Sequence, residues 1–407
     1  MNTKYIHYTL IIVATLLLSW FMPWLCGYLF DKPQKYPFAM YSSVVDDFAY
    51  TDFENGNIVY KDRSDNRYTQ KQYDSILPFF YYRQLIADNR LPATVKGKAI
   101  TTGTIQRENF VFRHSPADVN KTGVDLYPLL ESRSGRVDLK MPEDYFRITD
   151  KIYFVNAETN RLDNEKSELY TEALRKKDFS FPAKGIFGNP TTKKDYDEGY
   201  FVIDNNDKLF HLKMVCSRPF VRPVSLNNIV PTQLYVTEFR NKQSFAFMCT
   251  DENDFYMLAA PSYELVKLPF KFDPTQEGLS IIGDMLSWTI QKSNESGVEY
   301  LALDADSKQL LTSFTFDVND SAVDQVVRFI FPFQISMTSG IDKWAAPRIE
   351  YISYYALLAN LLFAAAYAYI HRGNKRRELI PALLFILVTG IFGFIALYTF
   401  KTKPEQA

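Results

Sequence analysis

The sequence has few histidines, few cysteines and none of the short motifs that mark common catalytic sites. Only four His and three Cys occur among 407 residues. No G-x-S-x-G elbow, H-E-x-x-H zinc motif, phosphate-binding P-loop or G-x-G-x-x-G dinucleotide fingerprint is present. The cysteines form no C-x-x-C pair, which argues against a zinc knuckle, a thioredoxin-type motif and haem attachment. The sequence therefore predicts no cofactor and no metal, and it favours a protein that is not an enzyme.

An excess of charge of either sign is also missing. Lys plus Arg total 46 against 47 Asp plus Glu, for a formal net charge of -1. Without a basic field, nucleic acid is not expected as a partner. What is abundant is aromatic side chains, with 33 Phe and 27 Tyr. Such residues suit half-buried pleated surfaces, so the soluble part is predicted to be rich in β-sheet.

Three long apolar runs stand out against this background, Tyr8–Phe30, Tyr351–Ile370 and Leu379–Phe400. The two C-terminal runs contain no charged residue and are about 20 residues long, enough to cross a hydrocarbon layer of roughly 30 Å. The first run is too long for the core of a cleaved signal peptide and lacks an A-x-A-like exit, so it is predicted to be an uncleaved anchor. We therefore expect three transmembrane α-helices and contact with membrane lipid.

The short link between the two C-terminal runs predicts the topology. Its basic residues are Arg372, Lys375, Arg376 and Arg377. Short loops rich in Lys and Arg stay in the cytoplasm, which places the large middle of the chain on the other side. The predicted segments are an anchor at 1–30, a mixed α/β portion at 31–190, a β-repeat portion at 191–348, transmembrane helices at 349–371 and 379–400, a cytoplasmic loop at 372–378 and a tail at 401–407.

The β-repeat portion shows a regular spacing of strands. Aromatic residues at Phe210, Tyr256 and Tyr300 recur at intervals of about 45 residues, the range of four-stranded propeller blades. Three such units are too few to close a ring, and earlier strands either supply the rest or leave an open stack. The predicted fold is a membrane-anchored, mainly β domain of propeller-like repeats with inserted helices; an irregular β-sandwich is the alternative.

Helices are expected at two places. Thr69-x-x-Gln72 is a capping-box pattern that predicts a helix from Gln70 to about Ala87, with a possible break at Pro78. A second helix is predicted at 165–177, and the strand-turn-strand segment before it aligns with the segment before the first helix at a constant offset. Both duplication of a unit and chance recurrence of Asn-rich turns explain this alignment.

One irregular segment concentrates a base, a hydroxyl and a carboxylate. Its candidate site residues are Arg113, His114, Ser115 and Asp118. Functional side chains favour loops, so a hydrolase-like site is one hypothesis. The alternative is a capped turn in which Asp118 binds local amides. The capped turn is favoured, because a serine next to its base in the chain is unlike the usual triad, which is assembled across the fold.

Three other residues are candidates for a structural or covalent role. His211 lies in the middle of a predicted strand, which favours an ordinary sheet side chain. A disulfide between Cys216 and Cys249 is one hypothesis if the domain faces an oxidising compartment, but two separate buried thiols are the favoured interpretation.

Several segments carry a resemblance that spans nearly the whole chain. They are the N-terminal anchor, SSVVDDFAYTDFENGNIVY, PFFYYRQL, FRHSPADVN and the closing helical hairpin. Together they resemble a family of uncharacterised inner-membrane proteins of Bacteroides-type bacteria, a domain of unknown function. The resemblance implies a Gram-negative inner membrane with the large domain in the periplasm, and it associates the chain with ABC-type export systems. Asp320-Ser321-Ala322 also matches the O-glycosylation pattern of these bacteria, which makes Ser321 a candidate acceptor.

These observations lead to three hypotheses. The first is a non-enzymatic accessory protein whose helices dock on another integral membrane protein, such as an ABC-type permease, while the periplasmic domain offers a recognition surface. The second is a periplasmic protein that senses or binds a small-molecule ligand. The third is a hydrolase-like enzyme that uses His114, Ser115 and Asp118.

Overall fold

The computed structural model describes residues 3–30, 36–54, 56–133, 135, 138–294, 296–317, 321–373 and 376–400. The chain divides into two compact units. The sheet unit comprises Tyr36–Phe316, and the helical unit comprises Met1–Lys35 with Asp317–Ala407.

The sheet unit is built mainly from five small sheets, four of which consist of consecutive strands. The first contains β1 (Phe38–Ser42), β2 (Asp47–Glu54), β3 (Asn57–Asp62) and β4 (Arg67–Tyr68). The second contains β8 (Tyr127–Pro128), β9 (Asp144–Ile148), β10 (Ile152–Asn156) and β11 (Leu162–Asp163). The third contains β12 (Gly185–Gly188), β13 (Tyr200–Ile203), β14 (Leu209–Val215) and β15 (Arg218–Val224), and the fourth contains β16 (Pro231–Val236), β17 (Ser244–Thr250), β18 (Asp254–Ala259) and β19 (Leu265–Lys271).

The fifth sheet has the order β23-β22-β21-β20-β7 and recruits one strand from far away in the chain. Its strands are β20 (Gly278–Gly283), β21 (Ser287–Asn294), β22 (Gly297–Asp304), β23 (Leu310–Asp317) and β7 (Phe110–His114). A two-stranded sheet of β5 (Thr94–Val95) and β6 (Lys98–Ala99) lies apart from these. The helices of the unit are α2 (Gln70–Ile76), α3 (Tyr82–Ala87), α4 (Thr102–Glu108), α5 (Pro116–Val119) and α6 (Asn164–Arg175).

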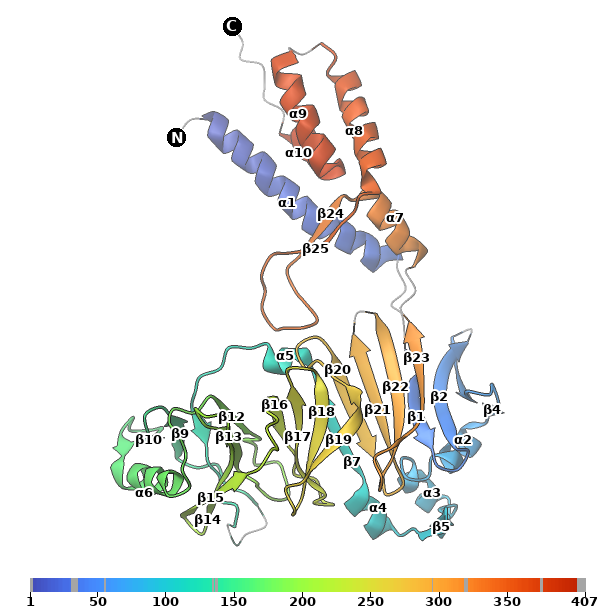
Figure 1. Cartoon of the computed structure of the whole chain (residues 1–407). Helices are drawn as coiled ribbons and strands as arrows, with labels where there is room; N and C mark the ends of the chain where they lie inside the picture. Colours follow the sequence, from blue (N-terminus) through green and yellow to red (C-terminus); the bar gives the residue numbers. More distant parts are fainter. Residues whose placement is uncertain are drawn as a thin grey trace. The chain divides into compact units, whose positions relative to one another are not determined.

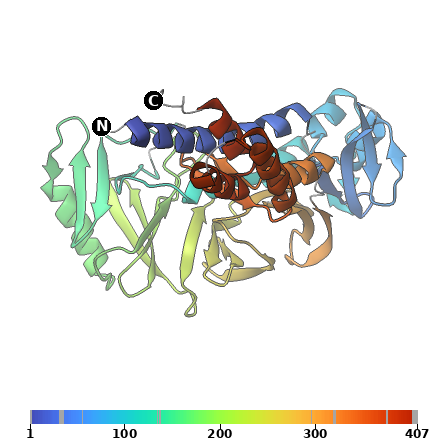
Figure 2. The same cartoon turned by 90° about the horizontal axis from the view of Figure 1, so that it is seen from above.

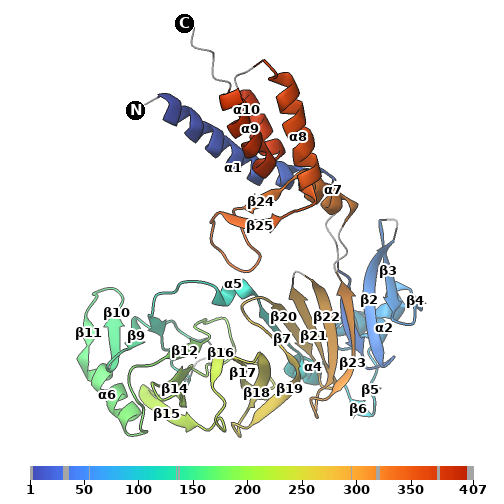
Figure 3. The ribbon, with the colours of Figure 1, turned by 45° about the horizontal axis from the view of Figure 1, so that its top comes forward.

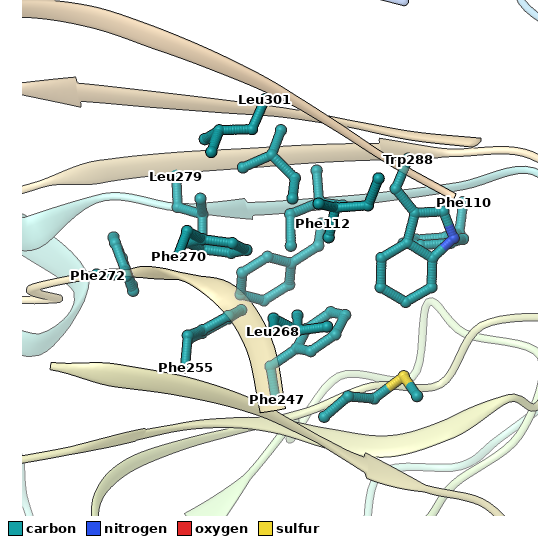
Figure 4. Close-up of a cluster of buried hydrophobic side chains, with 14 of the residues drawn as sticks. Phe110, Phe112, Phe247, Phe255, Leu268, Phe270, Phe272, Leu279, Trp288 and Leu301 are labelled. Atoms are coloured by element: carbon teal, nitrogen blue, oxygen red, sulfur yellow. The ribbon is translucent and has the colours of Figure 1, made fainter. Parts of the chain in front are cut away.

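Buried aromatic side chains join each sheet to the next. Phe146 of β9 shares a cluster with Phe210 of β14, and Leu209 of β14 shares one with Met248 of β17. Figure 4 shows the next cluster, in which Phe247 and Phe255 of β17 and β18 lie near Phe112 of β7 and Trp288 of β21. Phe48 of β2 and Tyr300 of β22 belong to the last. The sheets therefore follow one another in a row: β8–β11, β12–β15, β16–β19, β7 with β20–β23, and β1–β4 (Figures 1 and 2).

The position of a strand in this row explains its apolar sequence. All seven residues of β17 are buried. Phe247 and Cys249 belong to the cluster on one side of the sheet, whereas Ala246 and Met248 belong to the cluster on the other. Successive side chains of a strand point to opposite faces, so a strand with a neighbouring sheet on both sides must be apolar at nearly every position.

A capped helix packs against each of the two end sheets. Thr69 caps α2 through the expected box with Gln72, and Asp163 caps α6. Tyr73 of α2 and Tyr170 of α6 are fully buried, and each ring lies 4.8 Å from an aromatic ring of the adjacent strand. The predicted helix from Gln70 to Ala87 is divided into α2 and α3 around Pro78. These helices cover faces that would otherwise meet water.

The propeller-like prediction is wrong. The described chain is mainly β with several small sheets, and these sheets close into neither a barrel nor a propeller. Among the described residues, no buried cluster joins β1–β4 to β8–β11. The period of about 45 residues arises because each repeat contributes consecutive strands to one small antiparallel sheet. Such sheets have the same period in the sequence whether they are arranged in a row or in a ring, so the period could not distinguish the two.

The helical unit holds the apolar helices. It contains α1 (Thr3–Phe30), α7 (Ala322–Ile330), β24 (Phe333–Ser336), β25 (Arg348–Ile352), α8 (Ala356–Ile370), α9 (Arg376–Thr389) and α10 (Ile391–Thr399). One cluster packs Val327 of α7 and Phe392 of α10 near Leu18 and Met22 of α1. Figure 3 shows α7 and the β24–β25 hairpin beside α1, and α8 beside α9 and α10.

The prediction of three transmembrane helices is also wrong. Within the described residues, only the α1 segment Tyr5–Phe30 is long and apolar enough to span a membrane. The other runs form shorter apolar helices, Ala356–Ile370 and Leu379–Thr389. The first is short because residues 351 and 352 belong to β25, and the second because Gly390, with φ of 60°, separates α9 from α10. The structure therefore supports a single anchor or span and does not support a multi-pass protein.

Candidate functional site

A buried group of charged side chains lies where the β12–β15 and β16–β19 sheets meet. Its centre is Lys194, in the loop between β12 and β13. The Lys194 ammonium donates to the carbonyl oxygen of Asn189 at 2.7 Å, to Asp197 Oδ1 at 2.6 Å and to Glu238 Oε1 at 2.7 Å. The side chains of Lys194, Asp197 and Glu238 are only 5%, 3% and 2% exposed. We call these four residues the Lys194 network.

The carboxylates of the network have further partners. Glu238 also accepts from Asn189 Nδ2 and from the Glu198 amide, both at 2.8 Å. Asp197 Oδ2 accepts from the Ser132 hydroxyl at 3.1 Å and from the Gly199 amide at 3.0 Å. Burial raises the pKa of Glu238, while Lys194 opposes the shift.

The Lys194 network fixes the loop between β12 and β13 against Glu238, and this arrangement suits a structural role better than a reactive one. An ammonium has three donors, and Lys194 uses all three inside the protein. Buried charges persist only when they are paired and hydrogen-bonded, as these are. Sequence reasoning missed the network, although the dense charges of KKDYDE at 193–198 were a signal for it.

His211 is buried in β14 near this network. Its Nε2 lies 2.5 Å from the Glu198 carbonyl oxygen, and its Nδ1 lies 2.8 Å from the Tyr263 hydroxyl. A carbonyl only accepts, so Nε2 carries the proton and Nδ1 accepts from Tyr263. The ring also stacks on Phe201, and burial lowers the pKa of His211 to about 3. The expectation of a sheet side chain is confirmed, and both ring nitrogens are occupied.

The segment after β7 is a structural connection. His114 Nε2 donates to the Pro274 carbonyl oxygen at 2.8 Å, and burial lowers the pKa of the imidazole. Ser115 is the N-cap residue that precedes α5, and its amide donates to Asp118 Oδ2 at 3.3 Å. Arg113 is exposed and lies opposite Ser280 in the register of β7 and β20. His114 is therefore bonded to Pro274, and Ser115 to Asp118 through its backbone amide. These hydrogen bonds match the capped turn and differ from those of a catalytic triad, in which the histidine bonds the serine hydroxyl.

The remaining predicted residues belong to different elements of the two units. Cys216 and Cys249 are two separate free thiols, so the less favoured hypothesis of a disulfide between them is wrong. Cys249 is buried in β17, whereas Cys216 is exposed in the turn between β14 and β15. The Ser321 hydroxyl caps α7 by accepting from the Asp324 amide at 3.0 Å. Arg372, Arg376 and Arg377 are exposed around the link between α8 and α9; Lys375 lies outside the described residues.

An acidic hollow on the sheet unit offers no metal site. It has a volume of about 430 Å³, and Glu131 and Asp144 are among its lining residues. Glu131 accepts from the amides of Cys216 and Ser217 at 2.8 and 2.7 Å, and Asp144 pairs with Lys166 at 2.6 Å. No group of three potential metal ligands occurs among the residues that the structure describes.

The clearest interaction surface is the apolar exterior of α1. Tyr5 and Tyr8 are exposed near its start, and Trp20, Trp24 and Tyr28 near its end. The exposed residues between these two aromatic groups include Leu10, Ile12, Val13, Leu16 and Leu17. Aromatic side chains at both ends of an apolar helix are typical of a segment that crosses a bilayer.

Comparisons with known proteins give a family without an assigned role. A family model described as a domain of unknown function, DUF4857, matches residues 38–303. No curated protein matches. One similar solved structure comes from a study of PorZ, described as an essential bacterial surface component of the type-IX secretion system of Porphyromonas gingivalis. It shares 10% identity at a TM-score of 0.22, and the match covers 70% of this chain but only 27% of the other.

Proposed function

The chain belongs to the DUF4857 family, and we propose that it is a membrane-anchored, non-enzymatic accessory protein. In this proposal α1 is inserted in a bacterial inner membrane, and the sheet unit lies in the periplasm as a recognition domain. The partner is another integral membrane protein, such as the permease of an ABC-type exporter, which docks beside the helical unit.

The exposed surface of α1 carries the proposal. Its 26-residue apolar segment is about 39 Å long at 1.5 Å per residue, more than a hydrocarbon layer requires. Burial of one large apolar side chain is worth roughly 1.5–3 kcal/mol, and many such side chains on α1 are left exposed by the protein itself. A lipid environment accounts for this composition.

The helical unit offers surface for a neighbour as well. On α8, Leu358 and Leu362 are 64% and 70% exposed and lie one helical turn apart. In the sheet unit, the Lys194 network and His211 use their donors and acceptors internally, which suits a rigid scaffold better than a reactive site. The periplasmic placement is supported by the resemblance to inner-membrane proteins.

Photo-crosslinking in cells tests the accessory role. A photoreactive amino acid at Leu358 or Leu362 is expected to capture one integral membrane protein, identified by mass spectrometry. The same amino acid at Val124, which is exposed in the sheet unit, is the control and should not capture that protein. Recovery of the chain alone from every position would contradict the proposal.

A further inference from the structure

We propose that α7 and the β24–β25 hairpin form a second membrane contact, lying in the interfacial layer of the bilayer around the C-terminal third of α1. We call these two elements the collar. The partner is the boundary between phospholipid headgroups and acyl chains. This inference rests on the proposed anchoring by α1 and adds the depth at which the protein sits.

The packing of the collar against α1 determines which residues of α1 lie at the same level as the collar. Val327 and Phe331 lie in one cluster with Leu18, Met22 and Cys26 of α1. The exposed Trp20 and Trp24 occupy the same stretch of α1. Trp prefers the level of the headgroups, so a spanning α1 that places these two rings there also carries the collar to the interface.

The exposed face of α7 carries large apolar side chains beside the polar Gln325 and Arg328. Val327 is buried against α1, yet Val326 and Phe329, three residues apart on the helix, are 55% and 45% exposed. A surface helix of a water-soluble domain normally turns polar side chains outward. Exposed Val and Phe at this spacing instead match a helix that lies in the plane of a membrane interface.

The hairpin repeats the pattern. Ile349 and Ile352 of β25 are 64% and 63% exposed, and Tyr354 and Tyr355 follow with 80% and 76% exposure. Tyr has an apolar ring and a polar tip, which suits the boundary between lipid and water. The Arg328 guanidinium lies 5.7 Å from the centroid of the Tyr351 ring, so this part of the collar combines apolar and charged groups, as an interfacial segment does.

Depth-dependent quenching of tryptophan fluorescence tests the collar. The chain has four Trp, and Trp288 is buried in the sheet unit, which makes it a constant background. Replacing Trp20, Trp24 and Trp344 by Phe and introducing Phe329→Trp gives one reporter on α7. A second variant keeps Trp24 and lacks the α7 reporter. A third carries Val124→Trp in the sheet unit as the control.

Each full-length variant is reconstituted in vesicles of phosphatidylcholine and phosphatidylglycerol that carry a quencher in the headgroup or at the acyl-chain centre. The Phe329→Trp reporter is expected to lose roughly half of its emission with the headgroup quencher, and much less with the central one. The Val124→Trp control should respond to neither. Val326→Trp repeats the test if Phe329→Trp does not fold.

The outcomes separate the collar from the anchor. If Trp24 is quenched and neither α7 reporter is, the collar is overturned while anchoring by α1 stands. If an α7 reporter responds most to the central quencher, the collar is overturned because α7 lies too deep. If neither Trp24 nor the α7 reporters respond to any quencher, anchoring and collar both fail.

Discussion

At the scale of single residues, His211 makes the stability of the sheet unit depend on pH. Burial lowers the pKa of His211 to about 3, against the ordinary value of 6.5. Below pH 6.5 the unfolded chain binds a proton that the folded chain excludes, so the free energy of unfolding falls as the pH is lowered toward 3. The expected slope is at most about 1.4 kcal/mol per pH unit, and above pH 6.5 this residue contributes none.

The check is urea unfolding of the full-length protein in mild detergent at a series of pH values. His211→Gln is expected to flatten the acid limb, because no imidazole remains to be protonated. Tyr263→Phe is the matched control: it removes the partner hydroxyl and lowers the stability, but it keeps the imidazole and therefore the slope. An unchanged acid limb in His211→Gln would assign the pH dependence to other groups.

The Lys194 network predicts a large effect from one truncation. Lys194→Met leaves the Glu238 and Asp197 carboxylates buried without their cation, which is expected to lower the free energy of unfolding by about 3–5 kcal/mol. The exposed pair of Lys184 and Asp207, 2.6 Å apart, is the control, and Lys184→Met should cost less than about 1 kcal/mol. Both free energies of unfolding are measured with urea. An equal decrease in the two variants would show that the Lys194 network stabilises the fold no more than an exposed ion pair does.

At the scale of elements, Gly390 is the residue that divides the last apolar run. Its φ of 60° and ψ of -137° are strained for any residue with a Cβ atom, and a Cβ there would meet Asn360 Oδ1 and the Pro332 ring. The Asn360 amide donates to the Leu387 carbonyl at 2.9 Å, near the end of α9. Gly390→Ala is therefore expected to destabilise the helical unit by roughly 1–3 kcal/mol.

Thermal unfolding in detergent measures this effect, and Gly373→Ala is the matched control. A Cβ at Gly373 meets nothing within 4 Å, and the backbone of Gly373 is not in the left-handed region. The melting temperature of the Gly373→Ala variant should therefore equal that of the unmodified protein. A melting temperature for Gly390→Ala equal to that of the unmodified protein would mean that the break between α9 and α10 relaxes without cost.

Local sequence patterns predicted the elements better than their assembly. The cap at Thr69 and the strand around His211 depend on neighbouring residues and were found. The open row depends on α2 and α6 covering the end sheets, which no periodicity reveals. Gly390 was read as part of a continuous apolar run because composition does not report its φ. The Lys194 network was missed because its members, at 189, 194, 197 and 238, come together only in the fold.

At the scale of the whole molecule, the chain combines one long apolar helix, α1, with a row of five small sheets, and we propose that this row is a recognition domain. The Lys194 network within the row is hydrogen-bonded internally, whereas α1 leaves many large apolar side chains exposed. The proposal of a membrane anchor therefore rests on α1.

The most direct test uses a natural probe, the exposed Cys216 thiol. Intact spheroplasts are treated with a membrane-impermeant maleimide, the membranes are washed with carbonate, and labelling of the membrane-bound protein is measured, with Cys216→Ser as the control. The account predicts that Cys216 is labelled without permeabilisation and that the signal is lost in the variant. Labelling only after lysis, or protein released by the carbonate wash, would contradict it.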